Sequence, residues 1–452
     1  MRLMRANILA ITALIAFGPV AMAADSKKTA AMVEDYEHVP LPPGFQVIHS
    51  ELEGPVFADA AGHTLYNWPS KGLRNGDAGE QKGKPGCDNV KQTETSGLMS
   101  PYPPGLILPE VETRPTCTQV WPPVLASADA KPVGKWTVVT RNDGSKQWAF
   151  DGYPLYTSIL DTMPGQTNGG THRRTRGDAP AYRKPVSPPP NLPPQFRVER
   201  QMTGRLLTTG GFSVYASDKD GPNKSNCDAA CLRQWKPVLA PAYAKAQGEL
   251  SIFERSPGVN QWAFRKKPLY THLDEEKPAS FEGSDEPGWH NVFTTMAPKA
   301  PADFIVQASR GGEVLADKKG NTVYIYMCGD DAIDQLSCDH PDTPQAYRFA
   351  MCGGGDPKRC LETFPYVIAD KNAKSGSMAW SVVAIEPLTG KKAAPDSTTA
   401  LHVWAFRDRP VYTFARDKFP GDIGADGWGE FNAWRNGYKA FWLRDDFRNN
   451  AG

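Results

Sequence analysis

Hydrophobic and polar residues alternate in nearly the same way in three stretches of the chain. Each stretch contains Trp-Ala-Phe, and a Tyr stands eight residues after the Trp. Successive side chains of a β-strand point to opposite faces, so the Trp and the Phe of each copy share one face. The pattern predicts a strand, a tight turn and a returning strand at residues 147–157, 261–271 and 403–413. Such a repeat indicates one supersecondary unit present three times.

Each copy is preceded by further short β-forming stretches. An apolar strand comes first, and a hairpin with Gly, Asn or Asp in its turn follows. A Cys then stands four residues before an aromatic-proline turn; the pairs are Cys117 and Trp121, Cys231 and Trp235, and Cys360 and Phe364. The predicted fold class is all-β, with three tandem antiparallel β-meander repeat units, each of two half-repeats, stapled by disulfides and carrying long inserted loops. We expect one short helix near the second Cys of each unit; whether the units close into a propeller-like ring is left open.

The chain divides into seven predicted segments. Arg2 and Arg5 precede an apolar run that ends in Ala-Met-Ala at residues 21–23, which is typical of a secretory signal and its cleavage site. The segments are a signal peptide at 1–23, a flexible N-terminal segment at 24–43, repeat unit 1 at 44–171, a basic Pro-rich linker at 172–194, repeat unit 2 at 195–280, a second linker at 281–302 and repeat unit 3 at 303–445.

The units differ in the distance from the hairpin Tyr to the aromatic-proline turn. This distance is 20 residues in unit 2, 55 in unit 1 and 40 in unit 3, and unit 3 has a second insertion near residues 387–397. Insertions in repeat proteins usually lie in loops on one face, which is often the binding face. The inserted loops of units 1 and 3 are therefore the predicted recognition elements.

The composition indicates the cellular compartment of the protein and limits the classes of partner it could bind. The 51 basic and 50 acidic residues give a net charge of +1, and a general nucleic-acid binder would show a basic excess. No stretch after the signal peptide reaches the roughly 18 consecutive apolar residues of a membrane span. Eight Cys fit an oxidising compartment, in which paired thiols persist as disulfides. We expect a bacterial protein of the periplasm or the extracellular space.

The cysteines allow two interpretations. The favoured one is disulfides throughout: Cys87 with Cys117, Cys227 with Cys231, Cys352 with Cys360, and Cys328 with Cys338, although four Cys in unit 3 permit other pairings. The alternative is a copper or redox site at Cys227 and Cys231, whose sulfurs stand one helical turn apart. No pair of His has metal-ligand spacing and no nucleophile elbow is present, so no cofactor and no catalytic residue is predicted.

A short motif points to a known family. Residues 412–417 read Tyr-Thr-Phe-Ala-Arg-Asp, and weaker copies with Ser at the middle position stand at residues 156–161 and 215–220. The chain resembles the bacterial secreted repeat family of predicted lipoproteins marked by Tyr-X-(Phe/Trp/Tyr)-X-X-Asp. It departs from the family in having no lipobox Cys and in its two large insertions. The resemblance implies an exported repeat module with no established reaction, so no catalytic residue is carried over.

The repeat residues have a structural and a functional interpretation. Period-two spacing favours burial of the Tyr and Trp in the core, and the alternative is a set of aromatic platforms for sugars. The Asp that ends the motif is expected to bond nearby backbone in a turn. The motif residues are Tyr66, Tyr156, Tyr215, Tyr270, Tyr324, Tyr412, Trp148, Trp262, Trp404, Asp161, Asp220 and Asp417.

The leading hypothesis for function is an exported, non-enzymatic binding or scaffold protein. Its partner would be a protein, a polysaccharide or another component of the envelope, held by the inserted loops of units 1 and 3. A metal-binding or redox protein working through Cys227 and Cys231 is the first alternative. A carbohydrate-active protein built on the repeat aromatics is the second.

Overall fold

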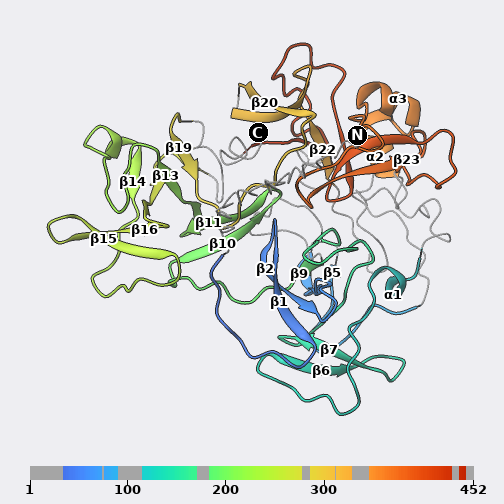
Figure 1. The fold of residues 1–452 in the computed structure, drawn as a ribbon, viewed down its shortest axis with the longest axis horizontal. Helices are drawn as coiled ribbons and strands as arrows, with labels where there is room; N and C mark the ends of the chain where they lie inside the picture. The colour runs from blue at the N-terminus through green and yellow to red at the C-terminus, as the bar shows by residue number, and fades with distance from the viewer. Residues whose placement is uncertain are drawn as a thin grey trace, which may run out of the picture. The chain divides into compact units, whose positions relative to one another are not determined.

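The computed structural model describes residues 34–73, 76–89, 115–170, 183–276, 283, 286–310, 312–327, 346–429 and 437–443, all within one compact unit, residues 33–452. We refer below to segment 1 (residues 45–186), segment 2 (196–293) and segment 3 (304–443). The predicted all-β class is confirmed, because antiparallel strands dominate every segment (Figure 1). The predicted signal peptide, Cys328 and Cys338 lie outside the described residues.

Each segment begins with a hairpin of two six-residue strands. In the first strand of segment 2, Phe196 and Val198 alternate with Arg197 and Glu199, whereas the second strands of the hairpins in segments 1 and 2 are buried along nearly their whole length. The pairs are β1 (Phe45–Ser50) with β2 (Gly54–Asp59), β10 (Phe196–Gln201) with β11 (Gly204–Thr209), and β20 (Phe304–Ser309) with β21 (Gly312–Asp317). A short strand, β12 (Phe212–Ser213), extends the second pair.

The Trp-Ala-Phe stretches form the middle strands of three further meanders. In each meander the Trp lies opposite an aliphatic residue, as in Val138↔Trp148, and the Ala lies opposite the Pro of the returning strand. The meanders are β6 (Trp136–Thr140), β7 (Lys146–Phe150) and β8 (Tyr153–Pro154); β15 (Leu250–Ser256), β16 (Val259–Phe264) and β17 (Lys267–Pro268); and β23 (Trp380–Ile385), β24 (Leu401–Phe406) and β25 (Arg409–Tyr412).

A strand that starts at a motif Tyr lies at the centre of each segment. β3 (Tyr66–Asn67) pairs with β9 (Lys184–Pro185), β13 (Tyr215–Ser217) lies between β18 (Tyr270–His272) and β19 (Trp289–Asn291), and β22 (Tyr324–Met327) lies between β25 and β26 (Gly437–Ala440). β14 (Trp235–Pro237) completes the sheet of segment 2.

The strands β9 and β19 fall within the two stretches predicted as linkers, at 172–194 and 281–302. Each pairs with the strand of the hairpin Tyr, and so belongs to the sheet of the segment before it. These strands are two and three residues long, and so short a run among Pro and Gly shows no period-two pattern. Residues of both stretches predicted as linkers thus contribute strands to the sheets of segments 1 and 2.

Helices are few and short in the described residues. A helical turn contains the second Cys of each pair, as predicted: α1 (Cys117–Val120), η2 (Cys231–Arg233) and α3 (Pro357–Thr363). The remaining elements are α2 (Ala346–Gly353) and the hairpin of β4 (Lys71–Leu73) and β5 (Gly76–Ala78). No helix in the described ranges has the length and hydrophobicity needed to cross a membrane.

The first described residues, which belong to the segment predicted at 24–43, contact later parts of the chain. Glu34 is buried and accepts two hydrogen bonds from Arg205 of β11, at 2.8 and 2.9 Å. Asp35 accepts a 2.8 Å bond from the Asn191 side chain, and Tyr36 forms an isolated bridge with Pro190. The segment is polar and lacks periodicity, so sequence alone gave no sign of these tertiary partners.

Candidate functional site

The six motif tyrosines meet in pairs. Tyr66 lies directly across from Tyr156, Tyr215 from Tyr270, and Tyr324 from Tyr412. The two motif Tyr of each segment therefore stand on adjacent paired positions of the backbone. All six side chains are buried, and so are Trp148, Trp262 and Trp404. The aromatic residues form core, as the alternation predicted, and they offer no surface for stacking a sugar.

A carboxylate of the motif binds a tyrosine hydroxyl of its partner half-repeat. The hydroxyl of Tyr66 donates to Asp161 Oδ2 at 2.7 Å. Tyr270 donates to Asp220 at 2.7 Å and Tyr324 to Asp417 at 2.6 Å. The second oxygen of each Asp accepts a backbone N–H six or seven residues further on, from Asn168, Asn226 and Gly424 respectively. The backbone contact was predicted, whereas the bond to the tyrosine was missed because it joins residues far apart in the chain.

Burial controls the protonation of these clusters. It raises the pKa of Asp161 to about 7, against the opposing effect of the hydrogen bonds from Tyr66 and the backbone of Asn168. Burial and the neighbouring Asp161 together raise the pKa of Tyr66 well above its usual value. In segment 2 the pKa of Tyr270 rises to about 12, first through burial. Tyr66 and Tyr270 thus stay protonated at neutral pH and can donate hydrogen bonds to Asp161 and Asp220.

Segment 1 contains a further buried carboxylate that the sequence did not single out. Glu80 Oε1 accepts bonds from the Tyr156 hydroxyl at 2.6 Å and from the N–H groups of Gly86 and Cys87 at 2.8 and 3.1 Å. Burial raises the pKa of Glu80, although these donors oppose the rise. Glu80 stands outside the repeated motif, so no sequence signal could have found it.

Disulfides close the same part of each segment. The expected pairs Cys87–Cys117, Cys227–Cys231 and Cys352–Cys360 are present. An arginine ties the first Cys of a pair to the Gln that precedes the repeat Trp: Arg141 bonds Gln147 and the carbonyl of Cys87, and Arg255 bonds Gln261 and the carbonyl of Cys227. In segment 3, Val403 replaces this Gln, and Arg348 instead bonds Tyr366 at 2.7 Å.

In each segment, one residue near the end of the segment stacks on the aromatic ring of the aromatic-proline turn. Trp235 stacks on Trp289, and Phe364 on Tyr438, each with centroids 3.6 Å apart. In segment 1 the guanidinium of Arg183 lies 4.5 Å from both the Trp121 and the Trp68 rings. An aromatic ring and a guanidinium fill the same structural position because both stack on a π-face.

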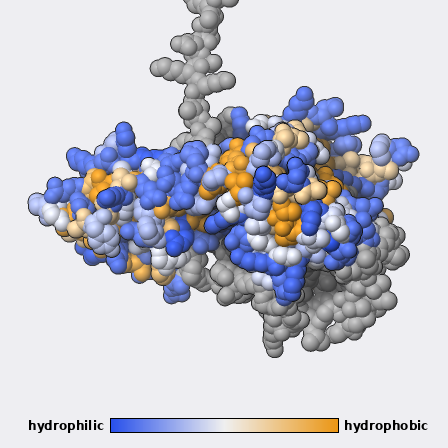
Figure 2. Space-filling model, turned by 90° about the horizontal axis from the view of Figure 1, so that it is seen from below, coloured by the Kyte–Doolittle hydropathy of each residue, from blue (hydrophilic) through white to orange (hydrophobic). Residues whose placement is uncertain are grey.

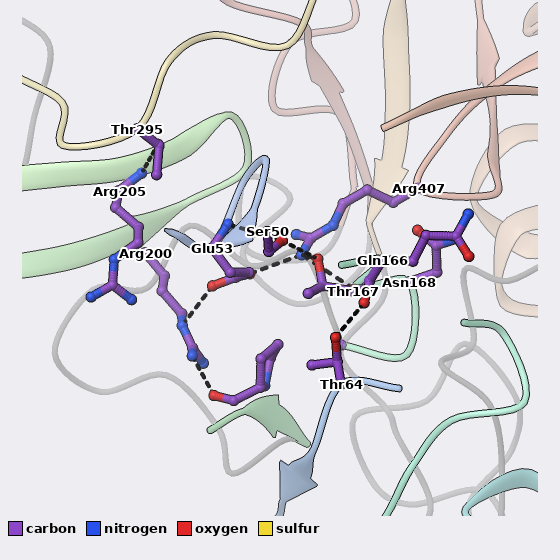
Figure 3. A network of polar contacts seen from close by, with 12 residues as sticks. Ser50, Glu53, Thr64, Gln166, Thr167, Asn168, Arg200, Arg205, Thr295 and Arg407 are labelled. Carbon is purple, nitrogen blue, oxygen red and sulfur yellow. Dashed lines mark hydrogen bonds and ion pairs between the residues drawn. The ribbon is translucent and has the colours of Figure 1, made fainter. Parts of the chain in front are cut away.

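A second network, shown in Figure 3, joins the three segments through buried charge. Glu53 stands in the turn between β1 and β2 of segment 1. Its Oε2 lies 2.8 Å from Nε of Arg200 in segment 2, and its Oε1 lies 2.8 Å from Nη2 of Arg407 in segment 3. Burial acts to raise the pKa of Glu53, but the charges of Arg200 and Arg407 outweigh it and hold that pKa below its usual value.

The same network reaches the tyrosine cluster of segment 1. Arg407 donates to the Thr167 hydroxyl at 3.1 Å, and Arg409 donates to the carbonyls of Asn168 and Gly170 at 3.0 Å each. The N–H of Asn168 in turn donates to Asp161. The loop after the motif Asp of segment 1 is therefore held by the β24–β25 turn of segment 3. We call the charged contacts around Glu53 and this loop the junction.

One exposed aliphatic residue recurs at an equivalent place in each segment. Leu125 is 61 % exposed, Leu239 51 % and Ile368 60 %. Each forms a bridge with the residue that precedes the repeat Trp. Figure 2 shows one face of the molecule, on which hydrophilic residues surround separate hydrophobic patches. Single exposed apolar residues are ordinary, so these three mark no site by themselves.

No group of three or more His, Cys, Asp or Glu that could hold a metal ion occurs in the part of the chain that the structure describes. In addition, Cys227 and Cys231 are joined to each other, and a metal would require their thiolates. The tyrosine clusters, the disulfides and the junction are thus the chemistry-bearing features of the described residues.

Part of segment 1 matches a known protein family. A family model described as a secreted repeat of unknown function matches residues 137–171, which cover the β6–β8 meander except for its first residue, together with Tyr156 and the motif Asp161. No curated protein and no solved structure matches the chain.

Proposed function

We propose that the protein is an exported, non-enzymatic binding or scaffold protein of the bacterial periplasm or cell exterior, whose inserted loops in segments 1 and 3 hold its partner. One observation carries the proposal: the tyrosines and carboxylates of the repeated motif are engaged in hydrogen bonds with each other, two of the three pairs fully buried. The carboxylates of Asp161, Asp220 and Asp417 each hold a tyrosine and a backbone N–H. Acid–base catalysis requires carboxylates that converge on a substrate, and these converge on the core.

The attachment of the inserted loops supports their role in binding. The insertion of segment 1 lies between Cys87 and Cys117. The disulfide between these two residues joins the two ends of the insertion, with their Cα atoms 5.3 Å apart. Arg141 holds the carbonyl of Cys87, and α1 holds Cys117 against the core. In segment 3 the insertion runs into α2, which the Cys352–Cys360 disulfide joins to α3. A rigid base lowers the entropy lost when a loop binds a partner.

The match to a secreted repeat supports export, and the predicted signal peptide agrees with it. The partner we propose is an envelope polysaccharide, an envelope protein or another component of the cell surface. Net charge near zero favours neither an anionic polymer nor a lipid headgroup as the general target.

Replacing residues 90–114 with a short Gly-Ser linker tests the proposal, because this variant keeps Cys87, Cys117 and Arg141. The assay is sedimentation of the purified protein with isolated cell envelopes and, separately, with purified peptidoglycan sacculi. We expect saturable binding by the native protein and about tenfold weaker binding by the loop variant, since a few residues dominate most interfaces. Leu239→Ser, which changes an exposed residue of segment 2, is the control and should bind as the native protein does.

Absence of saturable binding by the native protein to either material would contradict the proposal. Equal binding by the native protein and the loop variant would show that the segment 1 insertion does not recognise the partner. Thermal unfolding of both variants verifies that each remains folded.

A further inference from the structure

The disulfides of the described residues differ in their exposure to solvent. Cys87 and Cys117 are 1 and 2 % exposed, and Cys352 and Cys360 are 8 and 0 % exposed. Cys117 and Cys360 also lie 3.3 Å from the guanidinium of a buried arginine, Arg183 and Arg348 respectively. Cys227 and Cys231 are only partly buried, and the three residues between them are exposed. An attacking thiolate must reach a sulfur along the S–S axis, so access favours the disulfide of segment 2.

The turn that contains this disulfide is fixed by contacts other than the S–S bond. Arg255 donates to the carbonyl of Cys227 at 2.6 Å, and Asp220 accepts the N–H of Asn226 at 2.6 Å. The Asp228 carboxylate accepts the N–H groups of Ala230 and Cys231, both at 3.0 Å. Opening the disulfide therefore leaves both cysteines where they stand, with a sequence separation of only 4 residues for closing it again.

Aromatic residues form the floor beneath the two cysteines. Cys227 and Cys231 pack against a buried cluster that contains Trp235, stacked on Trp289, together with Tyr215 and Tyr270. These rings are held by the cross-strand pairing of β13, β14, β18 and β19, which does not involve the sulfurs. The two cysteines thus pack on buried aromatic rings on one side and are accessible to solvent on the other.

From these observations we infer that Cys227–Cys231 is a thiol–disulfide exchange site, which accepts two electrons from an exported dithiol while the other described disulfides stay closed. This inference goes beyond the proposed binding function and does not depend on it. The class of partner is a pair of thiols on one molecule. A monothiol is disfavoured because the neighbouring cysteine displaces it again from the mixed disulfide.

The exchange proceeds in two balanced steps. A thiolate of the dithiol attacks one sulfur of the pair; a mixed disulfide forms, the Cys227–Cys231 bond breaks, and the released thiolate takes up a proton. The second thiol of the partner, after losing its proton, attacks the mixed disulfide, releases the remaining cysteine as a thiol and closes the partner's own disulfide. Two electrons and two protons pass from the partner to this chain. The reverse steps return the chain to its disulfide form.

The charge of Asp228 tunes the rate of the first step. Its carboxylate bonds the N–H of Cys231 and so places a negative charge beside the sulfurs. This charge repels an incoming thiolate and disfavours the thiolate that leaves. Asp228→Asn keeps an oxygen acceptor for the N–H groups and removes the charge, so exchange should become about three- to tenfold faster.

The experiment uses the folded, full-length exported protein, incubated with dithiothreitol or with glutathione over a series of redox potentials. Free thiols are then alkylated, and the alkylated fraction of each cysteine is measured by peptide mass spectrometry. With dithiothreitol we expect Cys227 and Cys231 to be reduced about tenfold faster than Cys87 and Cys117 of the same molecule. With glutathione we expect little stable reduction. In a Cys231→Ser variant, the lone thiol of Cys227 should keep glutathione as a mixed disulfide.

Two results would overturn the inference. One is reduction of Cys227–Cys231 no faster than that of Cys87–Cys117, or only together with loss of the native circular dichroism spectrum. The other is an exchange rate in Asp228→Asn equal to that of the native protein and of Asp129→Asn, an exposed charge control in segment 1. Fast reduction by glutathione as well as by dithiothreitol would keep the exchange site but overturn its preference for dithiols.

Discussion

At the scale of single residues, the repeated Tyr and Asp act as one hydrogen-bonded unit. In segment 1 the Tyr66 hydroxyl and the backbone of Asn168 hold Asp161, and the same arrangement recurs around Asp220 and Asp417. A buried carboxylate is expensive unless its oxygens are bonded, and the tyrosine supplies the bond that the backbone cannot. The burial of Asp161, which raises its pKa to about 7, makes the cluster of segment 1 sensitive to pH near neutrality.

Asp161→Asn should change how stability depends on pH. The folded-state pKa of Asp161, about 7, lies above the unfolded value of 3.8, so the folded protein binds one proton more between these values. The free energy of unfolding contributed by this group is thus highest below about pH 4 and falls as the pH rises toward 7. Urea unfolding between pH 4 and 8 should show the difference in stability between the variant and the native protein shifting in favour of the variant as the pH rises. A difference independent of pH would contradict this assignment.

At the scale of elements, one two-residue turn closes all three Trp meanders. Its residues have positive φ in every copy: Asp151 and Gly152, Arg265 and Lys266, Arg407 and Asp408. Such a turn matches the right-handed twist of the flanking strands, and Asn-Gly or Asp-Gly suits it best. Segment 1 has this composition. Segments 2 and 3 place larger residues in a left-handed conformation, and in segment 3 the strain coincides with bonds from Arg407 to Glu53 and from Asn168 to Asp408.

Removing a side chain at the second position of one turn and adding one at the same position of another should have opposite effects on stability. Lys266→Gly removes a side chain from a position with φ of 68° and should stabilise the protein by up to about 1 kcal/mol. Gly152→Ala, at a position with φ of 83°, should destabilise it by about 1 kcal/mol or more. Urea unfolding midpoints measure both effects. Shifts of the same sign would show that factors other than backbone conformation decide stability at these turns.

At the scale of the whole molecule, the junction couples segments that are far apart in sequence. Glu53 pairs with Arg200 and Arg407, and the neighbouring Leu52 enters the core cluster of segment 3. Glu51 extends the contact, because it accepts a 2.8 Å bond from the hydroxyl of Ser377. A single hairpin turn of segment 1 thus contacts segment 3 through both apolar packing and charge.

Glu53→Gln should separate the unfolding of the segments. The change removes the negative charge that lies 2.8 Å from the guanidinium of Arg407, and breaking a buried ion pair in this way costs about 3–5 kcal/mol. We expect an earlier, multiphasic urea transition and faster limited proteolysis. Asp151→Asn, which breaks the exposed pair with Lys82, is the control and should cost less than about 1 kcal/mol. A single transition with an equally small loss in Glu53→Gln would show that the junction does not couple the segments.

The amino-acid sequence determined the local elements and their repetition. The Trp-Ala-Phe strands, the hairpins, the helical turn at the second Cys and three of the disulfides follow from period-two burial and from residue spacing, which are properties of short stretches. Burial of Tyr66 and Trp148 was predictable for the same reason. Only the tertiary structure revealed Glu80, Arg183 and Glu53, each of which has a partner tens to hundreds of residues away. It also placed β9 and β19 in the sheets, because strands of two or three residues are formed by pairing and not by their own pattern. Local periodicity is a property of neighbouring residues in the sequence, whereas the pairing of buried charges depends on which segments the fold brings together.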